Sequence, residues 1–134
     1  MHKQRARSLP LWLCVMLSSA LMIIGMVLLI APEAGEIAFG TRISEGGNYS
    51  FHRATGIREA YLGVIILILV WLRERRALGI LLLTVAIIPL ADVLIALNAP
   101  DGSLQQAFKH GMSAPVVMLL GWYYLTQDQA DQPR

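Results

Sequence analysis

Four ionisable residues lie within otherwise apolar segments of this 134-residue chain. They are Arg58, Glu59, Asp92 and His110. A carboxylate can act as a general base, an imidazole can act as its partner or as an acid, and a guanidinium can stabilise developing negative charge. Such groups are costly inside a membrane, by about 2.5–3.5 kcal/mol at a helix centre, and they mark function or a structural pair. What these four can do depends on the elements that carry them.

The composition is that of a membrane protein. Hydrophobic residues make up 56% of the chain and charged residues 15%, whereas about a quarter of the residues in a soluble domain are charged. The net charge of +2 does not indicate nucleic acid, because the basic residues flank apolar runs and serve there as topology signals. The single cysteine, Cys14, has no metal-ligand spacing around it, so we predict neither a metal site nor a cofactor.

The apolar runs predict four transmembrane helices, because a bilayer core of about 30 Å needs about 20 helical residues. We predict one membrane domain, residues 1–134, with spans at 9–31, 52–72, 77–97 and 107–125, an outer loop at 32–51 and a polar tail at 126–134. The first span is longer than the core of a signal peptide, so we expect it to be retained. We expect a short interfacial helix at 32–39 and a disordered tail.

Basic residues set the predicted orientation. Two groups fall on the same side of the predicted bundle: Lys3, Arg5 and Arg7 before the first span, and Arg73, Arg75 and Arg76 between the second and third. The positive-inside rule puts that side, with both termini, in the cytoplasm. We therefore expect an all-α, antiparallel up-down bundle of four helices, in a multi-pass protein of a bacterial inner membrane.

The four ionisable residues fall at one depth of this bundle, in the outer third of the bilayer. Arg58 and Glu59 lie in the first two turns of the second span, and His110 lies in the first turn of the fourth. Asp92 comes five residues before the outer end of the third span, about 7–8 Å below that end. Pro89 should kink the third span one turn before Asp92 and could open a polar cavity there.

The helix faces that carry these residues are rich in small side chains, which mark contacts between membrane helices. The faces are Gly56, Glu59, Ala60 and Gly63 in the second span, Ala86, Pro89, Asp92 and Ala96 in the third, and Ala107, His110, Gly111, Ala114 and Gly121 in the fourth. We therefore expect Glu59, Asp92 and His110 to point into the bundle. Arg58 lies at the edge, within reach of Asp92 or of the membrane interface.

Two interpretations of this polar layer have equal weight. In the first, the bundle binds a small molecule or a lipid, with Arg58, Tyr61, Asn98 and Lys109 as candidate substrate-binding residues. Its enzyme version takes Glu59, Asp92 and His110 as the catalytic candidates: either carboxylate is the base and His110 is its partner. In the second, the protein is a structural or assembly subunit, and Arg58–Asp92 or Glu59–His110 pairs fix helix register. A small transporter is a third, weaker option, because the inner halves of the spans are apolar.

The expected partners follow from these interpretations. They are the lipid bilayer, a lipid or small apolar ligand, and a second copy or a partner helix, but no nucleic acid. Two smaller expectations concern other side chains. Ser18 and Ser19 should hydrogen-bond to carbonyls of their own helix, and Trp12 and Trp71 should mark the inner membrane interface.

Residues 53–63 read R-A-T-G-I-R-E-A-Y-L-G. This segment resembles the R-x-x-G-x-R-[DE]-x-x-x-G signature of a family of small four-helix membrane proteins, the domain of unknown function four-two-six-seven. The resemblance extends over residues 9–125. Further similar features are Pro32 followed by Phe39-Gly40, the basic turn before Ala77-Leu78-Gly79, Asp92 late in the third span and His110 early in the fourth. The resemblance implies four membrane helices and supplies no activity.

Overall fold

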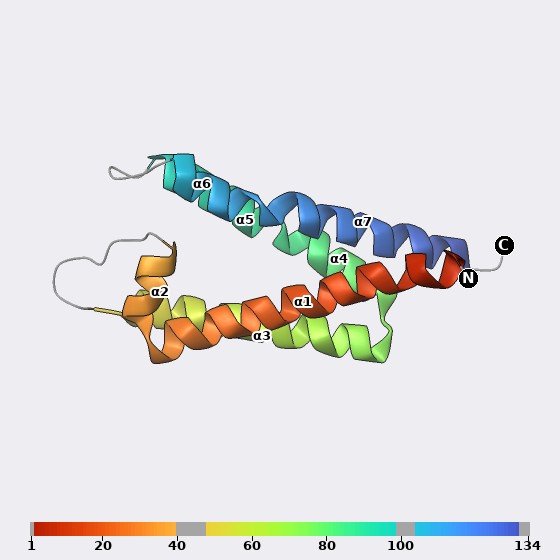
Figure 1. The fold of residues 1–134 in the computed structure, drawn as a ribbon, viewed down its shortest axis with the longest axis horizontal. Coiled ribbons are helices and arrows are strands. Elements are labelled where there is room, and N and C mark those ends of the chain that lie inside the picture. The colour runs from red at the N-terminus through yellow and green to blue at the C-terminus, as the bar shows by residue number, and fades with distance from the viewer. Residues whose placement is uncertain (1, 40–47, 99–103, 132–134) are drawn as a thin grey trace. The chain divides into compact units, whose positions relative to one another are not determined.

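The structure, a computed structural model, describes residues 2–39, 48–98 and 104–131, and these residues form helices joined by short turns. The helices are α1 (His2–Ile30), α2 (Pro32–Phe39), α3 (Ser50–Leu72), α4 (Arg75–Val85), α5 (Ile87–Asn98), α6 (Leu104–Gly111) and α7 (Ser113–Asp131) (Figure 1). The predicted all-α class is therefore confirmed. The chain divides into two compact units, Met1–Leu72 and Arg73–Arg134.

Three stretches of the described residues are long and apolar enough to cross a membrane: Ser8–Ile30, Ser50–Leu72 and Arg75–Asn98. They correspond to the first three predicted spans. The predicted fourth span, residues 107–125, begins in α6 and continues in α7, but the helix is interrupted at Met112. Because α7 ends in the polar residues 126–131, it does not reach the same apolar length on its own.

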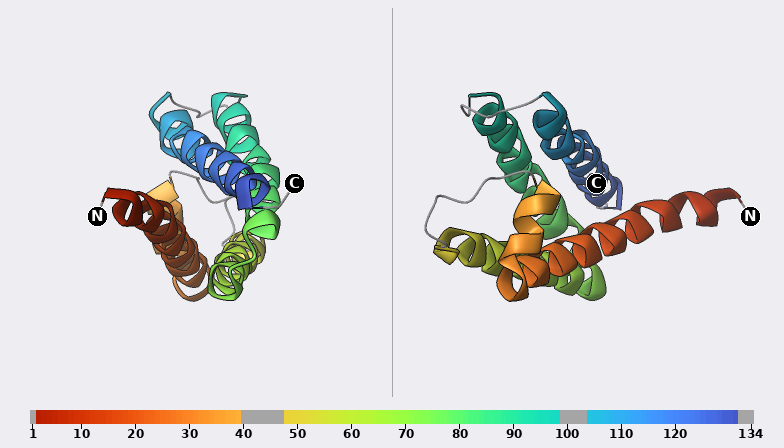
Figure 2. Two further views of the ribbon diagram at one scale, coloured as in Figure 1. Left: turned by 90° about the vertical axis from the view of Figure 1, so that its right-hand side faces the viewer. Right: turned by 60° about the vertical axis from the view of Figure 1, so that its left-hand side comes forward.

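In the first unit, α1 and α3 lie side by side along their length (Figures 1 and 2). The buried residues of α1 recur at intervals of three, four or seven, the spacing of two helices that pack lengthwise against each other. They include Cys14, Ser18, Gly25 and Leu28 on α1, and Gly56, Gly63 and Ile66 face them from α3.

Glycine and serine let the backbones of α1 and α3 approach closely. A Cβ added at Gly25 would lie 2.5 Å from the backbone nitrogen of Ala60 and 2.5 Å from the backbone oxygen of Gly56. The buried hydroxyl of Ser18 donates a hydrogen bond of 2.7 Å to the carbonyl oxygen of Gly63. The prediction that Ser18 bonds within its own helix was therefore wrong, because the close approach offers it a carbonyl of the neighbouring helix.

The helix predicted at residues 32–39 is confirmed as α2. It packs on the end of α1, where Gly35 lies against Leu28. The Tyr49 hydroxyl donates a hydrogen bond of 3.1 Å to Oε1 of Glu33, which ties the start of α2 to the residue that precedes α3. The backbone N–H of Ser50 donates to the side-chain oxygen of Asn48 at 3.0 Å, so a local side chain satisfies a donor at the first turn of α3.

In the second unit, the third predicted span is interrupted at Ala86, between α4 and α5. The break comes three residues before Pro89, whose ring lacks an N–H and leaves the carbonyl of Val85 without its helical donor. The Thr84 hydroxyl donates to the carbonyl of Ile80 at 2.8 Å, a contact that also bends helices. The predicted kink is confirmed, whereas the predicted polar cavity stays a prediction.

In the second unit, α4 runs antiparallel to α7 and α5 runs antiparallel to α6 (Figure 2). A Cβ at Gly79 would lie 2.8 Å from Cγ of Leu125, and one at Gly121 would lie 2.8 Å from Cγ of Leu83. Farther along, a Cβ at Gly111 would lie 3.0 Å from Cγ2 of Val93. Each advance along α4 and α5 is thus matched by an equal number of residues backwards along α7 and α6, so one antiparallel register holds along the whole pair.

The tail from residue 126 was predicted to be disordered. This prediction was wrong for residues 126–131, because α7 continues to Asp131. The Thr126 hydroxyl donates to the carbonyls of Trp122, at 3.1 Å, and Tyr123, at 2.9 Å. These bonds satisfy the hydroxyl within the helix, and Gln, Asp and Ala are tolerated in helices without an apolar face. The periodicity that predicts buried helices does not detect such an extension.

Candidate functional site

Arg58 and Glu59 form an ion pair on α3. Nη2 of Arg58 donates to Oε1 of Glu59 at 3.3 Å, and the two side chains are 52% and 14% exposed. Successive residues of a helix point about 100° apart and do not normally face each other. The long arginine side chain therefore turns back toward the half-buried carboxylate, which stands between Gly56 and Gly63 on the side of α3 that meets α1.

This geometry bears on the two interpretations of the polar layer. A pair formed by successive residues of one helix cannot fix the register of that helix against another. The pair is also a single contact, so most of the guanidinium donors are directed elsewhere. Among the described side chains of the first unit, Glu59 is the ion-pair partner of Arg58. The predicted Arg58–Asp92 pair stays a prediction.

Asp92 is half-buried on α5, in the second unit. None of the residues of α5 is fully buried, although α4 before it buries Leu78 and Leu82. Within the described residues of the second unit, no side chain is ion-paired with Asp92. Asp92 therefore stands on a loosely packed helix segment, one turn beyond Pro89.

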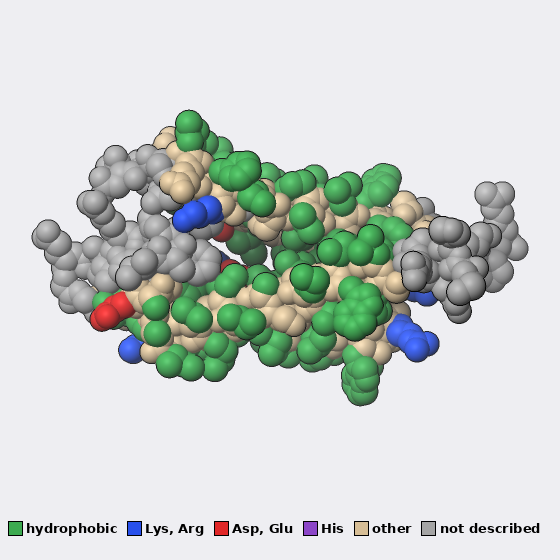
Figure 3. Space-filling view, in the orientation of Figure 1, with side chains coloured by type: hydrophobic (Ala, Val, Ile, Leu, Met, Phe, Trp, Pro, Cys, Tyr) green, Lys and Arg blue, Asp and Glu red, His purple; other side chains and the backbone are tan. Residues whose placement is uncertain are grey.

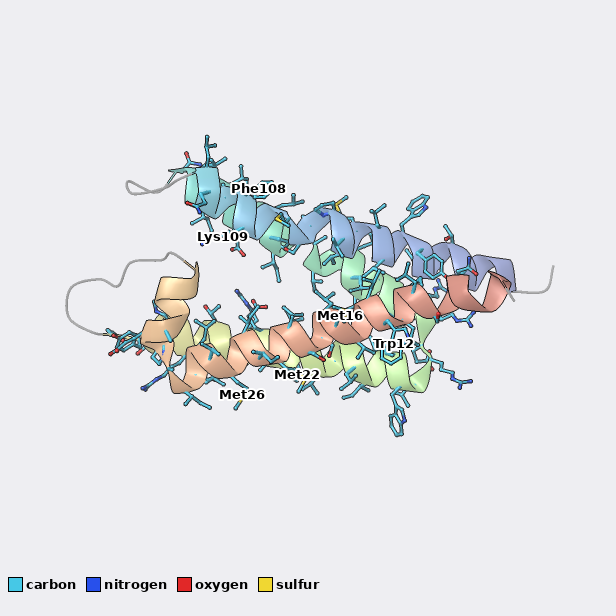
Figure 4. The ribbon with its side chains drawn as sticks, in the orientation of Figure 1. Trp12, Met16, Met22, Met26, Phe108 and Lys109 are labelled. Carbon is cyan, nitrogen blue, oxygen red and sulfur yellow. The ribbon has the colours of Figure 1, made fainter. Side chains whose placement is uncertain are left out.

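The remaining predicted site residues lie on different helices of the two units. Lys109 is exposed on α6 beside Phe108 (Figure 4), and the side chain of His110 lies outside the described residues. Tyr61 is exposed on α3, and Nδ2 of Asn98 donates to the carbonyl of Leu94 on its own helix at 2.7 Å. Arg58 and Glu59 are brought together, whereas the convergence of Glu59 with Asp92 and His110 remains a prediction.

In the second unit, a proline follows each of two breaks in the helices. The register through Gly111 and Val93 puts Pro89 opposite Pro115. Met112 precedes Pro115 by three residues, as Ala86 precedes Pro89, and each marks a break. The segments α5 and α6, which carry Asp92 and Lys109, therefore extend beyond two matched breaks, while the close glycine contacts hold α4 and α7 together.

Large apolar side chains cover the outer faces of the helices, and Lys and Arg gather toward their ends (Figure 3). Exposed examples are Trp12, Met16, Met26, Ile30, Trp71, Leu119 and Trp122, of which Trp12, Met16 and Met26 are spaced along α1 in Figure 4. Continuous apolar surface of this kind is rare on soluble proteins and suits lipid. Among the described residues, no group of three or more His, Cys, Asp or Glu is placed to hold a metal ion.

The family model of Domain of unknown function (DUF4267) matches residues 18–124. The chain belongs to this family. The match extends over most of each compact unit and includes the ion pair of α3. With three helices suited to spanning a bilayer, this member of the DUF4267 family is an integral membrane protein. No curated protein and no solved structure matches the chain.

Sequence reasoning missed the contact that joins the two helices of the first unit in this DUF4267 member. Ser18 and Gly25 are seven residues apart, and so are Gly56 and Gly63. Two small-residue heptads in consecutive antiparallel spans predict that the spans pack against each other. The face with Gly56 and Gly63 was predicted as a contact face, whereas its partner, the face with Ser18 and Gly25 on the first span, was not.

Proposed function

We propose that the protein is a four-span membrane protein with both termini in the cytoplasm, and that it binds a small molecule or lipid with an anionic group at Arg58. The observation that carries the proposal is the ion pair within α3. Charged side chains in a transmembrane segment cost free energy. This pair lies within one helix, so it does not offset that cost by holding two helices together. Its half-exposed guanidinium instead presents free donors, which suit the oxygen atoms of a carboxylate or phosphate.

The surface around Arg58 suits an amphiphile. Ile57, Tyr61, Val64 and Ile68 follow one another at intervals of four and three residues, and all are exposed. They form an apolar stripe along α3 that begins beside Arg58, with the Tyr61 hydroxyl one turn away. The stripe from Arg58 to Ile68 is about 15 Å long, about half of a bilayer core. An anionic head at Arg58 would thus place an apolar chain along this stripe.

The contacts within the units count against the assembly-subunit alternative. That alternative needs small-residue faces that are free to dock a partner helix. Gly25, Gly56 and Gly63 are used between α1 and α3, and Gly79 and Gly121 between α4 and α7. We also propose that Asp92 and His110 are functional polar groups of the second unit, because the sequence predicts them in the outer third of the bilayer.

Binding of palmitate to the purified protein tests this proposal. We expect Arg58→Gln to weaken palmitate binding about tenfold or more, because a hydrogen bond to a charged group contributes about 1.5–3 kcal/mol. Arg58→Lys should retain part of the affinity, since the charge remains but the fork of donors is lost. Titration followed by native mass spectrometry gives the affinity.

Arg53→Gln is the matched control, because Arg53 is also exposed on α3 and the change in charge is the same. It should leave palmitate binding unchanged. Hexadecanol, which has no anionic group, should bind the wild type and Arg58→Gln equally. Equal palmitate affinities for Arg58→Gln and Arg53→Gln would contradict the proposal.

A further inference from the structure

The turn between α3 and α4 contains an arginine in an unfavourable backbone conformation. Arg73 has a φ of 59° and is the one non-glycine residue with a positive φ among the described residues. It directly follows Leu72, the last residue of α3, and so holds the position where many helices place a left-handed glycine. A Cβ makes this conformation costly.

The topology signal does not explain why an arginine occupies this position. A positive-inside signal depends on the number of basic residues near the membrane, and an arginine elsewhere in the turn would supply the same charge without the strained φ. Strained backbone of this kind is found where a side chain has a function. The strained φ therefore favours a function for the Arg73 side chain.

The surroundings of Arg73 are positive and exposed. Arg75 and Arg76 follow it, Glu74 supplies one opposing charge, and all four side chains are exposed. The backbone N–H of Arg75 donates to the carbonyl of Arg73 at 3.0 Å, which closes the turn and holds Arg73 close to the start of α4. Glu74, the N-cap residue of α4, makes no side-chain cap hydrogen bond, so its carboxylate does not occupy the first turn.

We propose that Arg73 and Arg76 bind the phosphate of an anionic phospholipid. The turn joins two stretches that can span a bilayer, Ser50–Leu72 and Arg75–Asn98, so it lies at the level of the lipid headgroups. This location favours a lipid phosphate over a free one. The site is at the opposite end of α3 from Arg58, and the inference does not rest on the proposed function.

Titration of the detergent-purified full chain with phosphatidylglycerol and with phosphatidylcholine tests the inference. We expect Arg73→Gly to weaken phosphatidylglycerol binding about fivefold, the fold-change that matches about 1 kcal/mol per arginine at an anionic membrane surface. Its melting temperature without lipid should equal or exceed that of the wild type, because glycine suits the left-handed conformation. Phosphatidylcholine should bind weakly to both proteins.

Two further variants make the test specific. Arg73→Asn, which also tolerates a positive φ, should behave as Arg73→Gly does. Arg53→Gln, at the other end of α3, should bind phosphatidylglycerol as the wild type does. Native mass spectrometry and thermal unfolding give the lipid affinity and the stability.

Three results would overturn the inference. The first is unchanged phosphatidylglycerol binding in Arg73→Gly, and the second is an equal loss in Arg53→Gln, which would show unspecific attraction. The third is a lower lipid-free melting temperature in both Arg73→Gly and Arg73→Asn, which would show that the arginine is kept for the fold. Stabilisation by millimolar inorganic phosphate to the same degree as by phosphatidylglycerol would overturn the assignment to a lipid.

Discussion

Replacing Gly25 by alanine is expected to lower the free energy of unfolding by about 2–3 kcal/mol, as overpacked helix contacts do. The new Cβ would lie 2.5 Å from the backbone nitrogen of Ala60 and 2.5 Å from the backbone oxygen of Gly56. Backbone atoms cannot turn aside, so α3 must move away from α1. The movement would also stretch the hydrogen bond from Ser18 to Gly63, which adds about 0.6–1.7 kcal/mol in membrane proteins.

Gly35→Ala is the matched control for this prediction. Its Cβ would meet Cδ2 of Leu28, also at 2.5 Å, but that atom is the end of a flexible side chain that can rotate. Alanine also has the better helix propensity, by about 1 kcal/mol. We therefore expect Gly35→Ala to change stability by less than about 1 kcal/mol. Unfolding of both variants in mixed micelles measures the difference, and equal losses would show that backbone contact is not the cause.

Replacing Arg58 by methionine is expected to lower stability by about 2 kcal/mol, because it leaves the Glu59 carboxylate in the span without its cation. That carboxylate is 14% exposed in the wild type. Replacing both residues by methionine should restore or exceed the wild-type stability, since apolar residues pack well in place of a charge pair. Glu59→Met alone should cost less, because the half-exposed Arg58 can extend to the interface.

The four unfolding free energies of this double-mutant cycle give the coupling between the two side chains. Non-additivity of about 1 kcal/mol or more would agree with the observed pair. Additive changes would contradict it, since they would mean that the two side chains act independently. A double variant more stable than the wild type would agree with the proposal that the charges are kept for a ligand.

Hydropathy and the positions of the prolines predicted most of the fold. The second predicted span ends at Leu72, as α3 does, and the helix predicted at 32–39 has the bounds of α2. The kink before Pro89 follows from a missing N–H, which is local chemistry. These features could be predicted because each depends on a short segment and its solvent.

The site was less predictable, because its geometry depends on side-chain rotamers and on contacts between segments. Helical periodicity puts Arg58 and Glu59 on different faces, so it cannot predict that the arginine turns back to its neighbour. Hydropathy averaged over residues 107–125 also passes through Met112, where the helix is broken. Averages over a window do not detect such breaks.

The side of the membrane on which each terminus lies tests the four-span account most directly. Single cysteines at Gln4, Ser44 and Gln132 can be probed with an impermeant maleimide in intact cells and in inverted vesicles. The natural Cys14 is 0% exposed, so it should not react. We predict that the cysteines at 4 and 132 react in inverted vesicles and the cysteine at 44 in intact cells. If the cysteine at 132 reacts in intact cells while the cysteine at 4 reacts in inverted vesicles, the termini lie on opposite sides, and the account of four spans with a shared outer polar layer is wrong.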